Sequence, residues 1–506
     1  MNDKSIIIIG AGFAGLSAGI YAQMNGYRTR IFEMHTLPGG LCTAWKRQGY
    51  TIDACIHWLV GSAPGSNFHR FWEEVGIAQG REFVNLDEFM RYEGADGRTF
   101  ILYSDVNKLE QHMLAFSPAD AEATRQFIRG IRLCLAFDQP SEFDPPLARL
   151  RKTLKLGLLM ATRGREMQRW MQTTADELAG RFQDPIIRDA LREMWFPEFS
   201  VFFMLFTFAW LHAKSAGYPI GGSLPMSRAL ERRYLDLGGE IHYHSRIEKV
   251  LVEGDKAVGV RLADGSEHRA DRVISAADGH STIFKMLDGR YADAETRAPY
   301  EKWPTFPALL FVGLGVNRSF AAEPQTVSGF SFALHKPTEI ADAVVERLPV
   351  HIYNQDPTLA PPGKTSLVVM LPSSYDYWQA LAGDRAAYDE KKDQVARTVV
   401  ALLDQRFPGI SSQVEMVDVA TPLTWQRYTG NWKGSFEGWL ITPQNAATMM
   451  RPMRQTLPGL QNFYMCGQWV EPGGGLPTGV TSGRRLVQAL CKEDGGAFKT
   501  TVMERP

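Results

Sequence analysis

The chain has 506 residues, a hydrophobic fraction of 44% and a formal net charge of −1. This composition excludes a largely disordered chain, and the near-zero charge excludes a strong overall attraction to nucleic acid. Five scattered cysteines without a CxxC pair exclude a disulfide framework and a structural zinc site. We therefore expect no metal and no nucleic-acid partner, and a reducing, cytoplasmic setting.

The first forty residues predict a strand, a glycine turn, a helix and a second strand. Ser5–Ile9 is a continuous β-branched run, which is typical of a parallel strand covered on both faces. Ala14–Asn25 has helical character and stops at Gly26, which suits a helix C-terminus. Thr29–Phe32 predicts the second strand.

The sequence GAGFAG joins this first strand to its helix and predicts a dinucleotide site. Gly10 permits the tight turn, Gly12 lets the backbone approach a pyrophosphate, and Gly15 allows the helix to pack closely on the strand. Free N–H groups at the helix start favour phosphate. Glu33 ends the second strand, where an acid accepts hydrogen bonds from ribose hydroxyls. These features predict FAD or NAD without choosing between them.

Residues 76–217 form an insertion with a mostly helical pattern, facing substrate or membrane. Within it, Val201–Leu211 is too short to span a bilayer and predicts a buried helix or a tunnel wall. The segment 147–170 has leucines at helical spacing among many Arg and Lys residues. Such a helix lies in a membrane interface or presents a solvated face while it packs on the core, and both interpretations stay open.

The later chain completes a discontinuous domain. Residues 257–274 predict a hairpin followed by a return to the main sheet. Phe463–Cys466 predicts a strand that leads through a glycine-dense loop into a helix. Residues 286–455 mix strands with a helix. The predicted fold is α/β (α+β overall), with a Rossmann-type FAD-binding domain of residues 1–75, 218–285 and 456–495, and a substrate domain of residues 286–455.

Two further glycine loops favour a flavin. Pro38–Leu41 follows the ribose-binding acid, where a loop can pass beside the flavin or its ribityl chain. The loop at 472–483 runs into the last helix, whose N–H groups could face the flavin edge that gains negative charge on reduction. No second glycine fingerprint follows a strand, so we expect no separate NAD(P)H domain.

Longer motifs then identify a family. They are GYTIDACIHWLVG from Gly49, YPIGGSLPMSRAL, VISAAD, YTGNWKGSFEGW and CGQWVEPGGGLPTGVTSGRR. With the glycine motifs, they resemble the phytoene desaturase–carotenoid isomerase–retinol saturase family of FAD-dependent oxidoreductases. The resemblance implies backbone contacts of Ile247 with adenine. It implies FAD contacts at Gly10, Gly12, Phe13, Ala14, Gly15, Glu33, Gly39, Gly40, Leu41, Gly467, Gly479 and Val480.

The same resemblance implies the class of substrate. We expect chemistry on carbon–carbon bonds of a lipophilic polyene or isoprenoid, such as a carotenoid or retinoid. Desaturation, saturation and isomerisation remain open, as does the oligomeric state. The aromatic segments Trp195–Trp210 and Trp425–Trp439 are candidate tunnel walls. Two alternatives are an FAD amine oxidase that oxidises a C–N bond and a non-catalytic FAD scaffold.

His57 and Asp53 are the candidate catalytic residues. They lie four residues apart near the expected flavin, where His57 could move a proton while the flavin handles hydride. A structural, hydrogen-bonded histidine is the alternative. The chain departs from the family here, because Asp53 precedes Ala-Cys where many members have a D-x-G turn. Tyr218 and Arg427 are weaker candidates for polar pocket groups. Without GxSxG or HExxH, hydrolase and metalloenzyme functions have no support.

Overall fold

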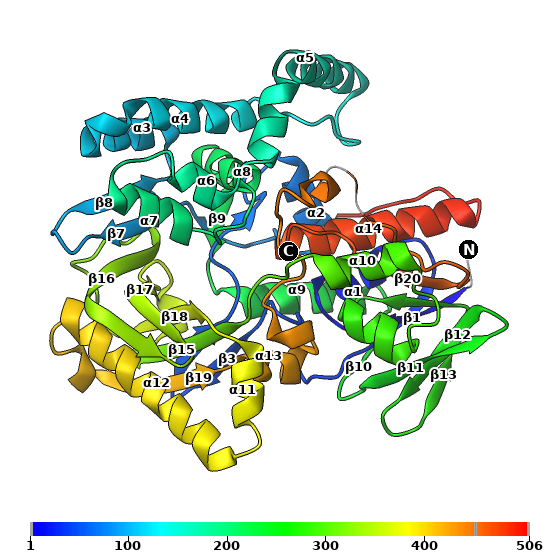
Figure 1. Ribbon diagram of the computed structural model, residues 1–506. Coiled ribbons are helices and arrows are strands. Elements are labelled where there is room, and N and C mark those ends of the chain that lie inside the picture. Colours follow the sequence, from blue (N-terminus) through cyan, green and yellow to red (C-terminus); the bar gives the residue numbers. More distant parts are fainter. Residues whose placement is uncertain (1–3, 450, 452, 503–506) are drawn as a thin grey trace.

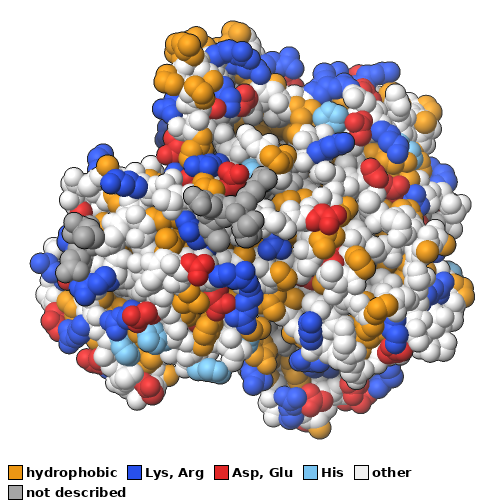
Figure 2. Space-filling view, turned by 180° about the vertical axis from the view of Figure 1, so that it is seen from behind, with side chains coloured by type: hydrophobic (Ala, Val, Ile, Leu, Met, Phe, Trp, Pro, Cys, Tyr) orange, Lys and Arg blue, Asp and Glu red, His pale blue; other side chains and the backbone are white. Residues whose placement is uncertain are grey.

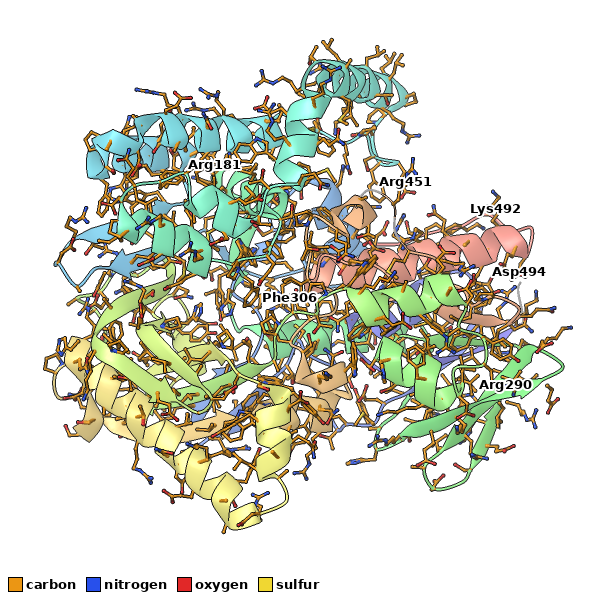
Figure 3. The ribbon with its side chains drawn as sticks, in the orientation of Figure 1. Arg181, Arg290, Phe306, Arg451, Lys492 and Asp494 are labelled. Atoms are coloured by element: carbon orange, nitrogen blue, oxygen red, sulfur yellow. The ribbon has the colours of Figure 1, made fainter. Side chains whose placement is uncertain are left out.

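The computed structural model describes residues 4–449, 451 and 453–502. Figure 1 shows three parts: a parallel sheet with helices around β1 and α14, a second sheet covered by α12, and a helical lobe that carries α3, α4 and α5 at the top. Phe306 lies near the centre of the molecule, between these parts (Figure 3). The fold is α/β overall, as predicted.

The first sheet has five parallel strands drawn from three distant segments of the chain. In spatial order, the strands are β10 (Glu240–His242), β2 (Arg28–Phe32), β1 (Ser5–Ile9), β14 (Arg272–Ser275) and β20 (Phe463–Met465). The isoleucines of β1 are buried on both faces, which explains the uninterrupted apolar run.

Alternate side chains of β1 face two different layers, which cover opposite faces of this sheet. Ile6 and Ile8 pack with the helices α1 (Phe13–Met24), α9 (Ser223–Asp236) and α14 (Gly475–Glu493). Ile7 and Ile9 face the three-stranded sheet of β11 (Ile247–Glu253), β12 (Lys256–Leu262) and β13 (Glu267–Arg269). Strands β12 and β13 form the expected hairpin before β14 returns to the main sheet.

The second sheet has seven strands and uses both insertions. In spatial order, they are β19 (Val414–Ala420), β15 (Leu309–Val316), β18 (Thr365–Pro372), β17 (Ala343–Ile352), β16 (Val327–Ile340), β7 (Glu88–Glu93) and β8 (Thr99–Tyr103). Helix α12 (Arg385–Arg406) packs on one face through its valines and leucines. Strands β7 and β8 come from the first insertion, so the insertions share a sheet.

The helical lobe consists of the rest of the first insertion. Its helices are α3 (Val106–Phe116), α4 (Ala121–Leu135), α5 (Pro146–Met171), α6 (Ala175–Ala179), α7 (Pro185–Glu193) and α8 (Val201–His212). Helix α8 is mostly buried, which confirms the expected buried helix. Over the residues that the structure describes, no helix is long and apolar enough to cross a membrane.

Shorter elements connect these parts. The strands are β3 (Ala44–Arg47), β4 (Tyr50–Asp53), β5 (Leu59–Val60), β6 (Phe83–Val84) and β9 (Ala216–Pro219). The helices are α2 (Asn67–Val75), α10 (Ala294–Lys302), α11 (Tyr375–Leu381) and α13 (Pro422–Thr429). The β3–β4 hairpin follows the second glycine loop and leads directly to His57, so it links the first sheet to the interior of the molecule.

Candidate active site

The glycine turn between β1 and α1 forms an open cradle. Gly10 has φ +96°, and a Cβ on Gly15 would overlap with the carbonyl oxygen of Gly10. A Cβ on Gly12 would meet only the carbonyl oxygen of Gly39, at 4.0 Å, so the space beside it is open. Among the described residues, no side chain caps the start of α1. The free N–H groups of this turn therefore suit a phosphate.

Glu33 lies beside this cradle at the end of β2. Its carboxylate accepts hydrogen bonds from the N–H groups of Ala11, at 2.7 Å, and His35, at 2.8 Å. Burial raises the pKa of Glu33, and these backbone donors oppose that rise. Each carboxylate oxygen can accept a further hydrogen bond, so the group suits a ribose hydroxyl. Ile247 is buried in the same hydrophobic cluster as Ile9 and Phe32.

The other predicted cofactor residues come together at the same place. Gly39 donates its N–H to the carbonyl of Ala11 at 2.8 Å. A Cβ on Gly467 would lie 3.2 Å from the Cβ of Ala14, and one on Gly479 would lie 3.1 Å from the Cβ of Phe13. Two more of these residues lie beside them. A Cβ on Gly40 would lie 3.4 Å from the Cα of Gly12, and Val480 is buried in the hydrophobic cluster that includes α1. Three distant glycine segments therefore surround the start of α1.

This arrangement fits FAD. An uncapped helix start, glycines that leave open space, and a buried acid are the groups that hold the pyrophosphate and ribose of a dinucleotide. The segment from Gly473 to Thr478 and Leu41 also line an adjoining cavity, which continues from this site into the rest of the molecule. The individual residue contacts with FAD stay a prediction.

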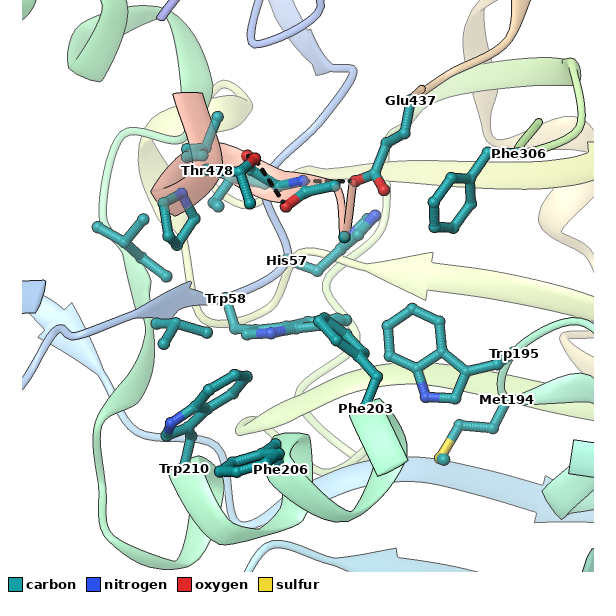
Figure 4. A pocket seen from close by; sticks show the side chains of 18 of the residues that line it. His57, Trp58, Met194, Trp195, Phe203, Phe206, Trp210, Phe306, Glu437 and Thr478 are labelled. Carbon is teal, nitrogen blue, oxygen red and sulfur yellow. Dashed lines mark hydrogen bonds between the residues drawn. The ribbon is translucent and has the colours of Figure 1, made fainter. Parts of the chain in front are cut away.

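The adjoining cavity has a volume of about 1390 Å³, which exceeds the range of most small-ligand sites. Its walls are rich in aromatic side chains, many of which come from α8 and from the loop before it. Both aromatic segments that the sequence suggested as walls contribute to it. Figure 4 shows several of these side chains around the space: Trp58, Trp195, Phe203, Phe206, Trp210 and Phe306.

Glu437 is a half-buried acid where this cavity meets the start of α14. Its Oε1 accepts a hydrogen bond from the N–H of Gly475 at 3.1 Å (Figure 4). Burial raises the pKa of Glu437 to about 8, although this backbone donor acts in the opposite direction. The side chain therefore holds a proton at pH 7. It can donate that proton into the cavity.

His57 lines the cavity together with a second histidine, His351 of β17. The two rings stack, with centroids 4.2 Å apart. The Nδ1 of His351 lies 2.6 Å from the carbonyl oxygen of Ser328. Burial lowers the pKa of His57 well below its ordinary value and that of His351 to about 4. Both rings are therefore neutral at pH 7, so each carries one N–H donor and one acceptor nitrogen.

Asp53 does not line the cavity, but it contacts residues that do. Its carboxylate accepts hydrogen bonds from the hydroxyl and N–H of Ser223, at the start of α9, and from the N–H groups of Cys55 and Ile56. Burial raises the pKa of Asp53, and the hydrogen bonds from Ser223 are the main opposing influence. We propose that Asp53 positions the loop that carries His57.

The two weaker candidates also lie outside the cavity lining. The Tyr218 hydroxyl donates to Asp356 at 2.9 Å and is fully buried. The Arg427 guanidinium lies 5.4 Å from the centre of the Tyr428 ring. Sequence reasoning missed Glu437 and His351, which do face the cavity. Glu437 lies in the singled-out stretch YTGNWKGSFEGW, but its burial arises only when α14 packs beside it.

Comparisons with known proteins identify the family of this chain. Residues 13–491 match the family described as flavin containing amine oxidoreductase. Prolycopene isomerase of Daucus carota is 23% identical, over 99% of this chain and 82% of that protein. Phytoene desaturase (lycopene-forming) of Pseudescherichia vulneris is 25% identical, over 97% of this chain and 99% of that protein. In fold, the chain is similar to cyclohexylamine oxidase from Brevibacterium oxydans, with a TM-score of 0.59 and 15% identity over 97% of this chain and all of that one.

The fold and the site define an FAD-dependent oxidoreductase. The family match spans most of the chain, and the dinucleotide cradle lies where that match begins. The chain belongs to the flavin containing amine oxidoreductase family, and within it the chain resembles the phytoene desaturases and carotenoid isomerases. The expected cofactor, FAD, and the expected enzyme class are thereby confirmed.

Proposed function

We propose that this enzyme acts on carbon–carbon bonds of a hydrophobic polyene or isoprenoid, by desaturation, saturation or isomerisation. The observation that carries the proposal is the large aromatic cavity that begins at the glycine-rich start of α14. Aromatic walls exclude water and hold an extended apolar chain. The full-length similarity to a prolycopene isomerase and a phytoene desaturase supports the same class of substrate.

Glu437 and His57 are the polar groups of the cavity that can transfer a proton to or from the substrate. Bound FAD supplies hydride chemistry, in a direction set by its redox state. Glu437 is protonated at pH 7 and faces the cavity, so it can deliver a proton to a carbon of a double bond, and it can accept a proton only after it has given up its own. The neutral His57, held against His351, accepts or donates a hydrogen bond beside it.

Oxidation of an amine is the second candidate, because the family description and the fold neighbour are those of amine oxidoreductases. An ammonium substrate gains most from a charged carboxylate in its pocket. Glu437 is neutral at pH 7, and its carboxyl group is engaged by the start of α14. At the start of α14, Glu437 therefore offers no charged carboxylate to an ammonium group at pH 7.

The test uses purified holoenzyme under anaerobic conditions. Phytoene and prolycopene in detergent micelles are incubated with the oxidised enzyme and with the dithionite-reduced enzyme, and the products are separated by chromatography. We expect a changed polyene with at least one redox form. Parallel incubations in air use cyclohexylamine and putrescine with detection of hydrogen peroxide. Peroxide with amines and unchanged polyenes would contradict the proposal and favour amine oxidation.

We also propose that α5 places this enzyme on a lipid bilayer. Its leucines at 147, 150, 154 and 158 are 83%, 57%, 66% and 65% exposed, which is unusual for large apolar side chains. Arg and Lys residues flank them, and Figure 2 shows hydrophobic and basic side chains gathered at the top of the molecule, where α5 lies. Such a helix inserts its apolar face among lipid headgroups.

The position of the cavity supports the same proposal. Lys152 of α5 and the segment 137–142 that precedes this helix line the cavity. A lipid-dissolved substrate could therefore pass from a bilayer into the cavity without crossing water. We expect cosedimentation with vesicles of phosphatidylglycerol and phosphatidylcholine at low salt. The double variant Leu150→Glu/Leu154→Glu should lose this binding, whereas Leu235→Glu, an exposed leucine of α9, should keep it. Binding that is unchanged in the double variant would contradict the proposal.

A further inference from the structure

Two cysteines lie opposite each other where the β3–β4 hairpin joins the glycine loop Pro38–Leu41. The antiparallel register of this hairpin continues beyond both strands, because Ala54 donates its N–H to the carbonyl oxygen of Thr43 at 3.1 Å. The next pair in this register is Cys42 and Cys55. Opposite residues of an antiparallel pair have Cβ atoms about 4.5–5.5 Å apart, so these two side chains are neighbours.

The two thiol groups interact directly, and both are free thiols in the structure. A side-chain hydrogen bond with Cys42 is the main cause that raises the pKa of Cys55 well above its ordinary value, and burial is the next cause. The Cys42 thiol also donates to the Ser223 carbonyl at 3.7 Å, and the Ser223 hydroxyl accepts from the N–H of Ile56 at 3.0 Å. The start of α9 therefore holds both cysteine segments in place.

A disulfide between these cysteines needs little movement. It requires Cβ atoms about 3.5–4.5 Å apart, which is only slightly closer than the usual spacing of opposite residues in an antiparallel pair. In a reducing compartment, such a disulfide is usually transient and catalytic, whereas a permanent one would serve stability. The pair therefore suits reversible redox chemistry.

The pair lies between the dinucleotide site and the cavity. Cys42 directly follows Leu41 in the chain, and both Leu41 and Cys55 line the cavity. Glu437, at the start of α14, is among the groups that raise the pKa of Cys55, so the Cys55 thiol lies at the end of the cavity that adjoins the dinucleotide site. Cys42 is 1% exposed, so Cys55 is the thiol of this pair that the cavity reaches.

We propose that Cys42 and Cys55 form a reversible dithiol–disulfide pair that exchanges two electrons with FAD. In one direction, the S–S bond forms, each thiol loses its proton, and two electrons and two protons pass to oxidised FAD. In the other direction, two electrons and two protons come from reduced FAD, the S–S bond breaks, and both thiols are restored. The pair stores two electrons beside the flavin, and this role does not depend on the identity of the organic substrate.

The test counts electrons and thiols in the holoenzyme. Diamide first oxidises the dithiol, and the excess reagent is removed. An anaerobic titration with dithionite should then consume twice as many electrons per FAD in the unaltered enzyme as in Cys42→Ala or Cys55→Ala. Labelling with N-ethylmaleimide in denaturant, followed by peptide mass spectrometry, should show linked Cys42 and Cys55 before the titration and two labelled thiols after it.

Two controls separate electron transfer through FAD from other causes. Apoprotein that carries the disulfide should keep it during the time in which the holoenzyme loses it, because dithionite then has no flavin to reduce. Cys134→Ala removes a buried cysteine of α4 outside the cavity lining, and this variant should behave like the unaltered enzyme.

Four results would overturn the proposal. They are a disulfide that diamide cannot form, a disulfide that stays intact while FAD is reduced, equal loss of the disulfide from apoprotein and holoenzyme, and equal electron uptake by the unaltered enzyme and Cys55→Ala. The first three are measured on the unaltered chain, so they do not depend on how well a variant folds. Each would leave the proposed function intact, because conversion of polyenes is measured separately.

Discussion

Replacing Glu437 by Gln tests whether the protonated carboxyl group of Glu437 takes part in catalysis. Gln has nearly the same shape, still accepts the hydrogen bond from Gly475 and cannot ionise. The folded enzyme holds Glu437 at a pKa of about 8, against an ordinary value of 4.5. Between these two pH values, the folded state retains a proton that the unfolded state has released. The free energy of unfolding therefore falls as pH rises through this window and levels off above pH 8.

The size of this effect follows from the two pKa values. One pKa unit corresponds to about 1.4 kcal/mol, so the interval sets an upper limit of about 5 kcal/mol. The Gln variant lacks this loss. We expect the variant and the unaltered enzyme to be equally stable at pH 5, and the variant to be more stable by several kcal/mol at pH 9. Turnover at pH 7 should fall by at least about 100-fold, the usual contribution of a general acid.

The assay combines three measurements on holoenzyme: FAD content by absorbance, urea midpoints at pH 5, 7 and 9, and turnover from pH 6 to 10. The unaltered enzyme should lose activity above pH 8, as Glu437 ionises, and the residual activity of the variant should lack that decline. The control is Glu301→Gln on the exposed surface of α10, which should change none of these quantities. Full turnover in the Glu437→Gln variant, with a stability difference that is the same at every pH, would refute the reasoning.

Three further substitutions test the rest of the site. Gly12→Ala places a Cβ in the open cradle, where it meets only the Gly39 carbonyl oxygen at 4.0 Å, so the apoprotein should keep its Tm while the Kd for FAD rises at least about tenfold, as measured by titration. Asp53→Ala removes the acceptor of four hydrogen bonds and should cost about 2–4 kcal/mol of unfolding free energy in urea. His57→Gln should keep FAD but lower turnover at least about tenfold; unchanged turnover would leave the histidine pair with a structural role.

The nucleotide-binding elements β1, α1 and β2 could be predicted because the constraints on them act between residues that are close together in the sequence. The turn after β1 needs a glycine at Gly10, where φ is +96°, and another at Gly15, where a side chain would overlap with the carbonyl of Gly10. These demands act over six residues, and Glu33 follows at the end of the next strand. A sequence pattern therefore predicts the strand, the turn, the helix and the acid together.

The seven-stranded sheet could not be predicted in the same way. Its strands β7 and β16 pair in parallel although more than 200 residues separate them in the chain. No local pattern specifies such a pairing, because the hydrophobic alternation of each strand would suit many partners. The sequence thus suggested two separate insertions, whereas the structure joins them in one sheet. That sheet supplies Arg347 and His351 to the cavity.

The polar groups of the cavity depend on this long-range assembly for their chemistry. Glu437 would be an ordinary acid in an isolated loop, and His351 would be an ordinary histidine on an edge strand. The packing of α14, α8 and the second sheet partly shields both from water, which raises the pKa of Glu437 to about 8 and lowers that of His351 to about 4. Under the proposed function, the carboxyl group is the proton carrier and the histidine is a neutral hydrogen-bonding group. If these roles hold, the usual functions of the two residue types are exchanged in this site, because burial shifts their pKa values in opposite directions.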